Sequence, residues 1–317
     1  GVPELPSALL QDFAAEAPPQ PPAVWAEWLG GYLERELEMI TDDTAPRVDT
    51  GEQSSIQGGS SLLEDQSQCP FRAFAKHRLQ VEPLGTLHVG LSAGERGSLL
   101  HDALNLLWGD LCNHEALLAL DDVGQAQTVI RAVQAAIASV PFKQQRKVGA
   151  AYWRLEERRL VALLCEWLNL ERQREAFTVV ARELEVTLEL ARLPISLRVD
   201  RVDQLADGSR MIIDYKSRSS SVQDWFGDRP AQPQLPLYRI AEPESVTGMA
   251  FGVVRPRECR FVGLGPVAAA PGISSDLSRL AKIGVDVQEW SELGEYWRNT
   301  LERLAATFVA GDAPVDP

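Results

Sequence analysis

The feature that most constrains the fold is the segment from residue 193 to residue 218, LPISLRVDRVDQLADGSRMIIDYKSR. Ile195, Leu197 and Val199 alternate with polar residues, which is the period of a half-buried β-strand. An Asp-Gly pair follows at residues 207–208, and this pair favours a tight hairpin turn. The apolar run after the turn starts a second strand, so the segment predicts a β-hairpin.

The hairpin carries charged side chains at informative positions. Asp214 and Lys216 are two residues apart on a strand, so they project from the same face of the sheet, whereas Tyr215 points the other way. Asp200 and Asp203 are three residues apart and point to opposite faces. Only one of them can join Asp214, and the sequence leaves open which one, because the register of the hairpin is not known.

Two carboxylates that converge on one point repel each other and favour a bound cation. Oxygen ligands suit Mg²⁺ or Mn²⁺ better than zinc. A divalent cation can activate water and neutralise a phosphate, and a neighbouring lysine can orient the water or stabilise the developing charge. A surface ion pair is the alternative, because Asp-x-Lys triplets are common on strands. The apolar residues just before the triplet, at positions 211–213, indicate a buried strand, and this favours a catalytic site over a surface ion pair.

The order of patterns along the chain predicts an α/β (mixed α+β) protein. Strand-like alternation begins at Phe177, after a mainly helical first half. The expected helices cover residues 61–80, 94–111, 122–140, 145–176, 232–242 and 284–309, with a break near Pro70. The expected strands cover residues 177–190, 193–205, 210–218, 246–256 and 259–265.

Composition sets limits on the class of protein. The net charge of −14 argues against a protein that coats nucleic acid through bulk positive charge. The four cysteines form no Cys-x-x-Cys pair, so we expect no zinc site and a reduced, cytoplasmic protein. No apolar run approaches the roughly 20 residues of a membrane span. We expect residues 1–59 to be a leader or linker of a longer protein, and residues 60–317 to be the catalytic domain.

Four motifs, in order, resemble those of the RecB/AddB-like branch of the PD-(D/E)XK nuclease superfamily. The run LRVDRVDQLADGSRMIIDYKS is similar to its Asp…Asp-Tyr-Lys core, and QLPLY is similar to its Gln-x-x-x-Tyr motif. Upstream, GSLLH resembles the Gly-x-x-x-His motif and CPF at residues 69–71 resembles the AddB-like segment. The resemblance spans about residues 60–240 and implies a restriction-endonuclease-like core. That core is a central mixed sheet flanked by helices, here with an added helical region.

The resemblance also implies roles for single residues. Asp200 and Asp214 would be the acidic metal ligands and Lys216 the catalytic lysine. His101 and the backbone carbonyl of Tyr215 would complete the metal shell. Gln234 and Tyr238 are four residues apart and share one helix face; in the family this face supports the site and approaches DNA.

Further residues are candidates for contacts with DNA. We expect Arg72 and Arg201 to support the site or contact phosphates, and Trp225 is a candidate for base stacking. Glu183 or Glu185, on the strand before the hairpin, could approach the metal. The pattern favours the other interpretation, in which both belong to a solvated or salt-bridged strand face. The remaining basic candidates are Lys76, His77, Arg78, Arg198, Arg218, Arg255, Arg257 and Arg260.

The chain departs from the family pattern in two places. Leu197 occupies the position of a usual glycine, where a side chain could narrow the approach to the metal. AddB-like nucleases often hold an iron–sulfur cluster with four cysteines, whereas only Cys259 follows Tyr238 here. We therefore expect no iron–sulfur cluster and a buried structural role for Cys69.

These observations predict a Mg²⁺- or Mn²⁺-dependent deoxyribonuclease, with exonuclease action in DNA repair or recombination. A helicase-like region of the parent protein, or a helicase partner subunit, is the expected protein partner. The alternative is a catalytically inactive nuclease-fold module that binds DNA or a partner protein. Nothing in the sequence recognises a ribose 2′-hydroxyl, so the choice between DNA and RNA also stays open.

Overall fold

The computed structural model describes residues 42–48, 59–82, 90–141, 145, 148–242, 246–265 and 269–316. Most of the expected leader lies outside the described residues. Thr44 bridges to Asp312, and Val48 donates a backbone hydrogen bond to Val309, so residues 43–48 pair with the C-terminal part of the chain. The domain boundary near residue 60 stays a prediction.

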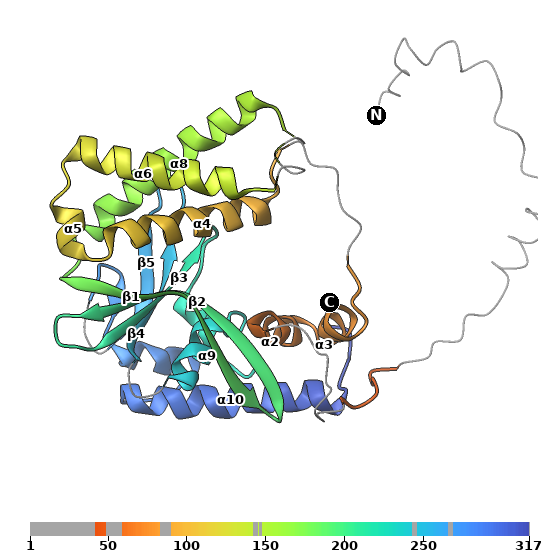
Figure 1. Ribbon diagram of the computed structural model, residues 1–317. Helices are drawn as coiled ribbons and strands as arrows, with labels where there is room; N and C mark the ends of the chain where they lie inside the picture. The colour runs from red at the N-terminus through yellow and green to blue at the C-terminus, as the bar shows by residue number, and fades with distance from the viewer. Residues whose placement is uncertain are drawn as a thin grey trace, which may run out of the picture. The chain divides into compact units, whose positions relative to one another are not determined.

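A six-stranded mixed sheet forms the centre of the molecule, in the order β1-β2-β3-β4-β5-β6 (Figure 1). β1–β2, β2–β3 and β4–β5 are antiparallel, whereas β3–β4 and β5–β6 are parallel. This mixed sheet with helices on both faces confirms the predicted fold class. The strands are β1 (Phe177–Leu190), β2 (Leu193–Leu205), β3 (Arg210–Lys216), β4 (Val246–Val253), β5 (Arg260–Leu264) and β6 (Ile273–Ser274).

Helices cover the two faces of the sheet and enclose two hydrophobic clusters. One face packs against α2 (Gly59–Gln68), α9 (Gln234–Ala241) and α10 (Trp290–Ala310), and Figure 1 shows α9 and α10 along it. The other face packs against α4 (Ala93–Leu111), α6 (Asp122–Ser139) and α8 (Ala150–Glu171), which form the expected helical region. The shorter elements are α3 (Pro70–Ala73), η2 (Phe74–Arg78), α5 (His114–Leu118), η3 (Val222–Trp225) and η4 (Leu277–Ile283).

The starts of α4 and α3 follow from local chemistry. At Ser92 the side chain accepts from the backbone N–H of Glu95, whose own side chain accepts from the Ser92 backbone, which is a capping box. Proline at the first helical position suits α3, and the predicted break at Pro70 is confirmed because Cys69 separates α2 from α3. The buried face of α4 includes Leu104, whereas Leu106 is exposed.

The pairing of the central strands determines where the charged residues lie. The β2–β3 ladder ends at the pair Arg201–Ile213, so Asp200 lies just beyond the last paired position. β3 continues beside β4, where Asp214 is opposite Phe251 and Lys216 opposite Val253. Asp200 and Asp214 therefore come together where the β2–β3 pairing ends.

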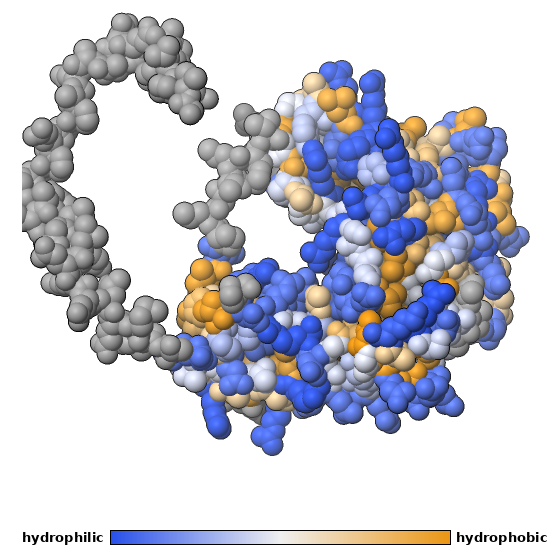
Figure 2. Space-filling model, turned by 180° about the vertical axis from the view of Figure 1, so that it is seen from behind, coloured by the Kyte–Doolittle hydropathy of each residue, from blue (hydrophilic) through white to orange (hydrophobic). Residues whose placement is uncertain are grey.

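The surface carries mostly polar side chains, as the face in Figure 2 shows, with hydrophobic residues between them. The most exposed large apolar residues include Leu155 and Val123, which are 65% and 64% exposed. Within the described ranges, no helix combines the length and the apolar character that a membrane crossing requires.

Candidate active site

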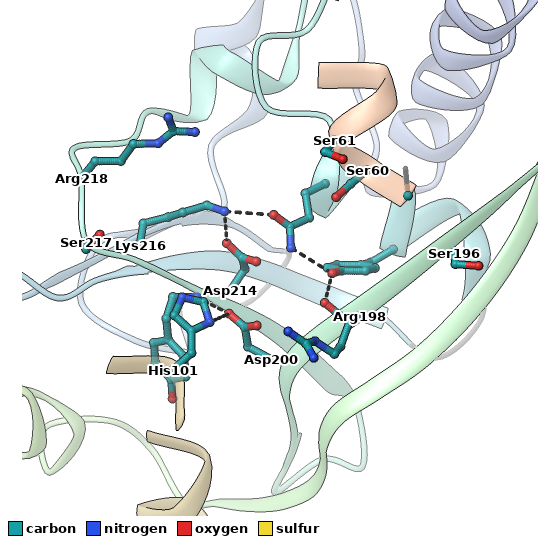
Figure 3. A pocket seen from close by; sticks show the side chains of 14 residues that line it. Ser60, Ser61, His101, Ser196, Arg198, Asp200, Asp214, Lys216, Ser217 and Arg218 are labelled. Atoms are coloured by element: carbon teal, nitrogen blue, oxygen red, sulfur yellow. Dashed lines mark hydrogen bonds and ion pairs between the residues drawn. The ribbon is translucent and has the colours of Figure 1, made fainter. Parts of the chain in front are cut away.

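A polar pocket of about 440 Å³ opens beside the ends of β2 and β3 (Figure 3). Asp200, Asp214 and Lys216 line it from the strands, and His101 lines it from α4. The structure thus brings together the four side chains that the sequence and the family resemblance single out, although they come from three elements. The pocket wall also contains Ser60, Ser61, Ser196, Arg198, Ser217 and Arg218.

Asp200 is held at the point where the β2–β3 ladder ends. Its Oδ2 accepts a hydrogen bond of 2.8 Å from the backbone N–H of Tyr215, so a side chain replaces a ladder carbonyl there. The same oxygen lies 3.3 Å from Nδ1 of His101. Asp200 is 8% exposed, and these two contacts fix its carboxylate toward the pocket.

Asp214 and Lys216 share one face of β3, as predicted. The Lys216 ammonium lies 2.7 Å from Oδ2 of Asp214, and the Asp214 side chain is only 1% exposed. The ion pair is short but poorly aligned, so neither Asp214 oxygen has a well-formed hydrogen bond within the described part of the chain. A buried carboxylate with unsatisfied oxygens costs free energy unless a cation compensates it.

Burial and neighbouring charges change the acidity of this group. Burial raises the pKa of Asp214 to about 6; the Lys216 charge works in the opposite direction, and repulsion from Asp200 adds to the rise. Burial alone would lower the pKa of His101, but its hydrogen bond to Asp200 and the nearby carboxylate charges raise it above its usual value. Burial and the nearby Asp200 charge therefore disfavour the ionised form of Asp214, and the Lys216 charge offsets this only in part.

Helix α9 positions the lysine through a chain of hydrogen bonds. Lys216 Nζ donates to Oε1 of Gln234 at 2.9 Å, and Nε2 of Gln234 donates to the Tyr238 hydroxyl at 3.0 Å. The Tyr238 hydroxyl in turn donates to the backbone carbonyl of Arg198 on β2. Gln234 and Tyr238 thus contact the site from one face of α9, as the spacing predicted.

The residues present fit a divalent cation by their chemistry. Asp200 and Asp214 offer hard oxygen atoms, and the Asp214 oxygens are buried without a well-formed hydrogen bond. His101 lies against Asp200 and Lys216 pairs with Asp214, so these two side chains partly offset the negative charge of the carboxylates. As the side chains stand, no group of three or more His, Cys, Asp or Glu residues in the described ranges has a metal-binding arrangement.

The structure resolves the choice between the two aspartates of β2. Asp200 joins Asp214, whereas Asp203 is fully buried on the opposite face of the sheet. Arg201 lies on that face as well and is 1% exposed, with its guanidinium 2.6 Å from Asp203. The expectation that Arg201 contacts DNA is therefore corrected, because its guanidinium is enclosed by the core.

Several other candidates lie away from the pocket. Arg72 pairs with Asp65 at 2.8 Å and does not line the pocket, so the structure does not bring it to the site. Trp225 is fully buried against Phe251, which corrects the expectation that it stacks on bases. Cys69, expected to be buried, is partly exposed. Lys76 and His77 also pair with Asp65, and Arg255 and Arg260 pair with Glu258.

Leu197 does not narrow the approach to the acidic residues. Its side chain is 3% exposed and belongs to the hydrophobic cluster on the α9 side of the sheet. The next residue, Arg198, is the one that faces the pocket. The leucine that replaces the family's glycine is therefore accommodated in the hydrophobic core and does not enter the pocket.

Glu183 is closer to the site than the sequence suggested. Burial raises its pKa, and repulsion from Asp200 adds to the rise. It pairs with Arg198 at 2.9 Å, and its φ of +46° is unusual for a residue other than glycine. Glu183 does not line the pocket itself, and β1 has a register shift between Val179 and Ala181. Glu185 remains on the exposed surface.

Comparisons with known proteins agree with this geometry at the level of the superfamily. The family model described as "PD-(D/E)XK nuclease superfamily" matches residues 60–317. Among solved structures, the chain is similar to a putative exonuclease from Eubacterium rectale, with 11% identity, a TM-score of 0.34, and coverage of 80% of this chain and 82% of that chain. It is also similar to the protein SSO0001, with 12% identity, a TM-score of 0.26, and coverage of 78% and 83%. Both TM-scores are too low to support an argument. No curated protein matches the chain.

Proposed function

The chain belongs to the PD-(D/E)XK nuclease superfamily over residues 60–317, and on this basis we propose that it hydrolyses phosphodiester bonds of DNA with Mg²⁺ or Mn²⁺. The observation that carries the proposal is the pair of buried carboxylates, Asp200 and Asp214, beside the Lys216 ammonium in an open polar pocket. A structural core has no use for unsatisfied carboxylate oxygens, whereas a metal-dependent hydrolase requires them.

In the proposed site, Asp200, Asp214 and His101 hold the cation. A divalent cation supplies Lewis acidity, which lowers the pKa of water and neutralises phosphate charge. The ligand role of the Tyr215 carbonyl remains part of the proposal. Within the described part of the chain, Lys216 forms an ion pair with Asp214 and donates one hydrogen bond to Gln234, so its ammonium keeps donor capacity for a water or a phosphate oxygen.

The direct test is incubation of the full chain with end-labelled single- and double-stranded DNA. We expect cleavage with Mg²⁺ or Mn²⁺ and none with EDTA, because the carboxylates cannot bind phosphate without a cation. A matched RNA substrate in the same assay tests the choice of DNA. If the protein binds DNA but neither cleaves it nor binds Mn²⁺, the alternative of an inactive binding module is correct instead.

A milder substitution tests the role of α9. We expect Gln234→Ala to lower kcat roughly tenfold, because Lys216 loses the partner that orients its ammonium. KM should change little, since Gln234 acts on the lysine. Gln223→Ala is the matched control: its side chain is exposed on η3. Equal kcat values for the two variants would remove Gln234 from the proposed machinery.

The finer assignments rest on the motifs of the sequence. We propose that the chain belongs to the RecB/AddB-like branch and acts as an exonuclease in DNA repair or recombination. In this proposal residues 60–317 form the catalytic domain, and a helicase-like region of the parent protein or a partner subunit supplies DNA. A cytoplasmic location and the absence of an iron–sulfur cluster remain part of the same proposal. Product analysis on labelled ends separates exonuclease from endonuclease action.

A further inference from the structure

Four buried charged residues form a closed network behind the pocket, on the opposite face of the sheet. We call Glu171, Arg174, Arg201 and Asp203 the buried charge quartet; their side chains are between 0% and 1% exposed. Glu171 ends α8, Arg174 follows it, and Arg201 and Asp203 lie on β2. Two carboxylates and two guanidinium groups make the quartet electrically neutral.

The contacts within the quartet are short and reciprocal. Arg201 donates through Nε and Nη2 to the two oxygens of Asp203, at 2.6 Å and 2.7 Å, and through Nη1 to Glu171 at 2.7 Å. Arg174 donates to Glu171 at 2.8 Å and to Asp203 at 2.7 Å. Burial works to lower the pKa of Arg201, but the charges of Asp203 and Glu171 outweigh it and hold the pKa well above its ordinary value.

Stability alone is a weak explanation for such a network. Each buried ion carries a desolvation penalty of several kcal/mol, and apolar residues of similar volume often stabilise a core as well as a buried ion pair does. The ion pairs add a geometric constraint. The fixed geometry of guanidinium–carboxylate bonds sets the relative orientation of the elements that carry these residues. The question is therefore which elements the quartet aligns.

The quartet contacts the strands and the helix that carry the proposed metal ligands and the lysine, namely β2, β3 and α4. Arg201 Nη1 donates to the Tyr215 hydroxyl at 3.0 Å, and the Tyr215 backbone N–H binds Asp200. The guanidinium carbon of Arg201 lies 3.7 Å from the centre of the Trp108 ring on α4, the helix that carries His101. The Tyr215 ring meets the His101 ring edge to face, with centroids 6.2 Å apart.

From this arrangement we propose that the buried charge quartet acts through Tyr215 as a positioning device for the site. Tyr215 lies between Asp214 and Lys216 on β3, so the bond from Arg201 to its hydroxyl fixes the strand from behind. The same tyrosine sets Asp200 through its backbone and His101 through its ring. Arg201 and Tyr215 are then positioning residues, since their side chains act on the metal ligands and do not touch substrate. The inference rests on the proposed metal-dependent function.

The test is Tyr215→Phe, which removes the bond to Arg201 but keeps the ring against His101. We expect Mn²⁺ affinity and kcat to fall by roughly tenfold or more, as for other groups that orient metal ligands, while KM for DNA is unchanged. Tyr296→Phe is the matched control, because its hydroxyl also takes part in one hydrogen bond of 3.0 Å, from the Gly227 backbone. The thermal midpoints of the two variants should agree.

An NMR measurement makes the outcome independent of cleavage, and a double variant tests whether the two residues act together. The chain has only four histidines, so the imidazole NMR signals of His101 can be followed in the metal-free protein. They should shift in Tyr215→Phe and not in Tyr296→Phe. Arg201→Lys combined with Tyr215→Phe should lower kcat by less than the product of the two single effects, because the two residues act as a unit.

The result that overturns the positioning proposal is a Tyr215→Phe protein with wild-type Mn²⁺ affinity, kcat and His101 signals. Loss of stability without a change in these three quantities would also overturn it, because the quartet would then be purely structural. Failure of the proposed function looks different: the wild-type protein itself would neither bind Mn²⁺ nor cleave DNA. In that case the His101 signals still test whether the quartet positions the pocket.

Discussion

Replacement of Lys216 by Met is expected to reduce DNA cleavage by about a hundred- to a thousandfold, the usual effect of removing one preorganised donor from an active site. Methionine keeps the aliphatic length beside Phe251 but loses the ammonium that lies 2.7 Å from Asp214. In the proposed function the lysine acts on the reacting phosphate, so the loss should fall on kcat. Single-turnover cleavage at saturating DNA, in Mg²⁺, measures it.

The control for this substitution is Lys282→Met, which removes an exposed lysine at the end of η4, outside the pocket. It changes the net charge by the same amount, so any general electrostatic effect on DNA binding appears in both variants. DNA binding in Ca²⁺ should persist in both proteins. Cleavage by Lys216→Met at the rate of Lys282→Met would show that the chemistry lies elsewhere.

Replacement of Asp214 by Asn is expected to abolish cleavage and to stabilise the metal-free protein at neutral pH. Burial raises the pKa of Asp214 to about 6, so the folded protein retains a proton that the unfolded chain, with an ordinary pKa near 3.9, has lost. Ionising this carboxyl in the folded state costs free energy, and asparagine avoids the cost. The gain is at most about 3 kcal/mol, from 1.36 kcal/mol for each pKa unit.

The pH dependence of this effect has a definite sign. Between about pH 4 and pH 6 the folded wild-type protein binds more protons than the unfolded chain, so its stability falls as the pH rises. The advantage of Asp214→Asn should therefore be small near pH 4, grow through pH 6 and be complete at pH 8. A gain of 1 kcal/mol corresponds to about 2–4 °C in thermal midpoint for a chain of this size.

Thermal unfolding in EDTA at several pH values measures the change in stability. The same measurement with Mn²⁺ tests whether Asp214 binds the cation. A ligand that binds only the folded state stabilises it, so Mn²⁺ should raise the midpoint of the wild-type protein and not that of Asp214→Asn. Asp228→Asn, at a side chain that is 91% exposed, is the control. An Asp214→Asn protein that is less stable than wild type at pH 8 in EDTA would refute the account of Asp214.

Much of the site could be predicted from local patterns. Side-chain alternation placed Asp214 and Lys216 on one face of a strand and Tyr215 on the other, and the structure agrees. The spacing of Gln234 and Tyr238 placed both on one helix face, where Gln234 binds both Tyr238 and Lys216. These inferences hold because strand and helix periods are properties of the backbone, independent of the rest of the fold.

The sequence by itself therefore determined the mixed α/β class, the hairpin with its two charged strands, and the residues from which a site could be built. Only the tertiary structure decided that Asp200 joins Asp214 while Asp203 and Arg201 turn to the opposite face, and that Trp225 and Leu197 pack into the core. The reason is physical. Which face of a strand is buried depends on strand register, backbone irregularities and the helices packed on each side, and these arise from contacts between residues far apart in the chain.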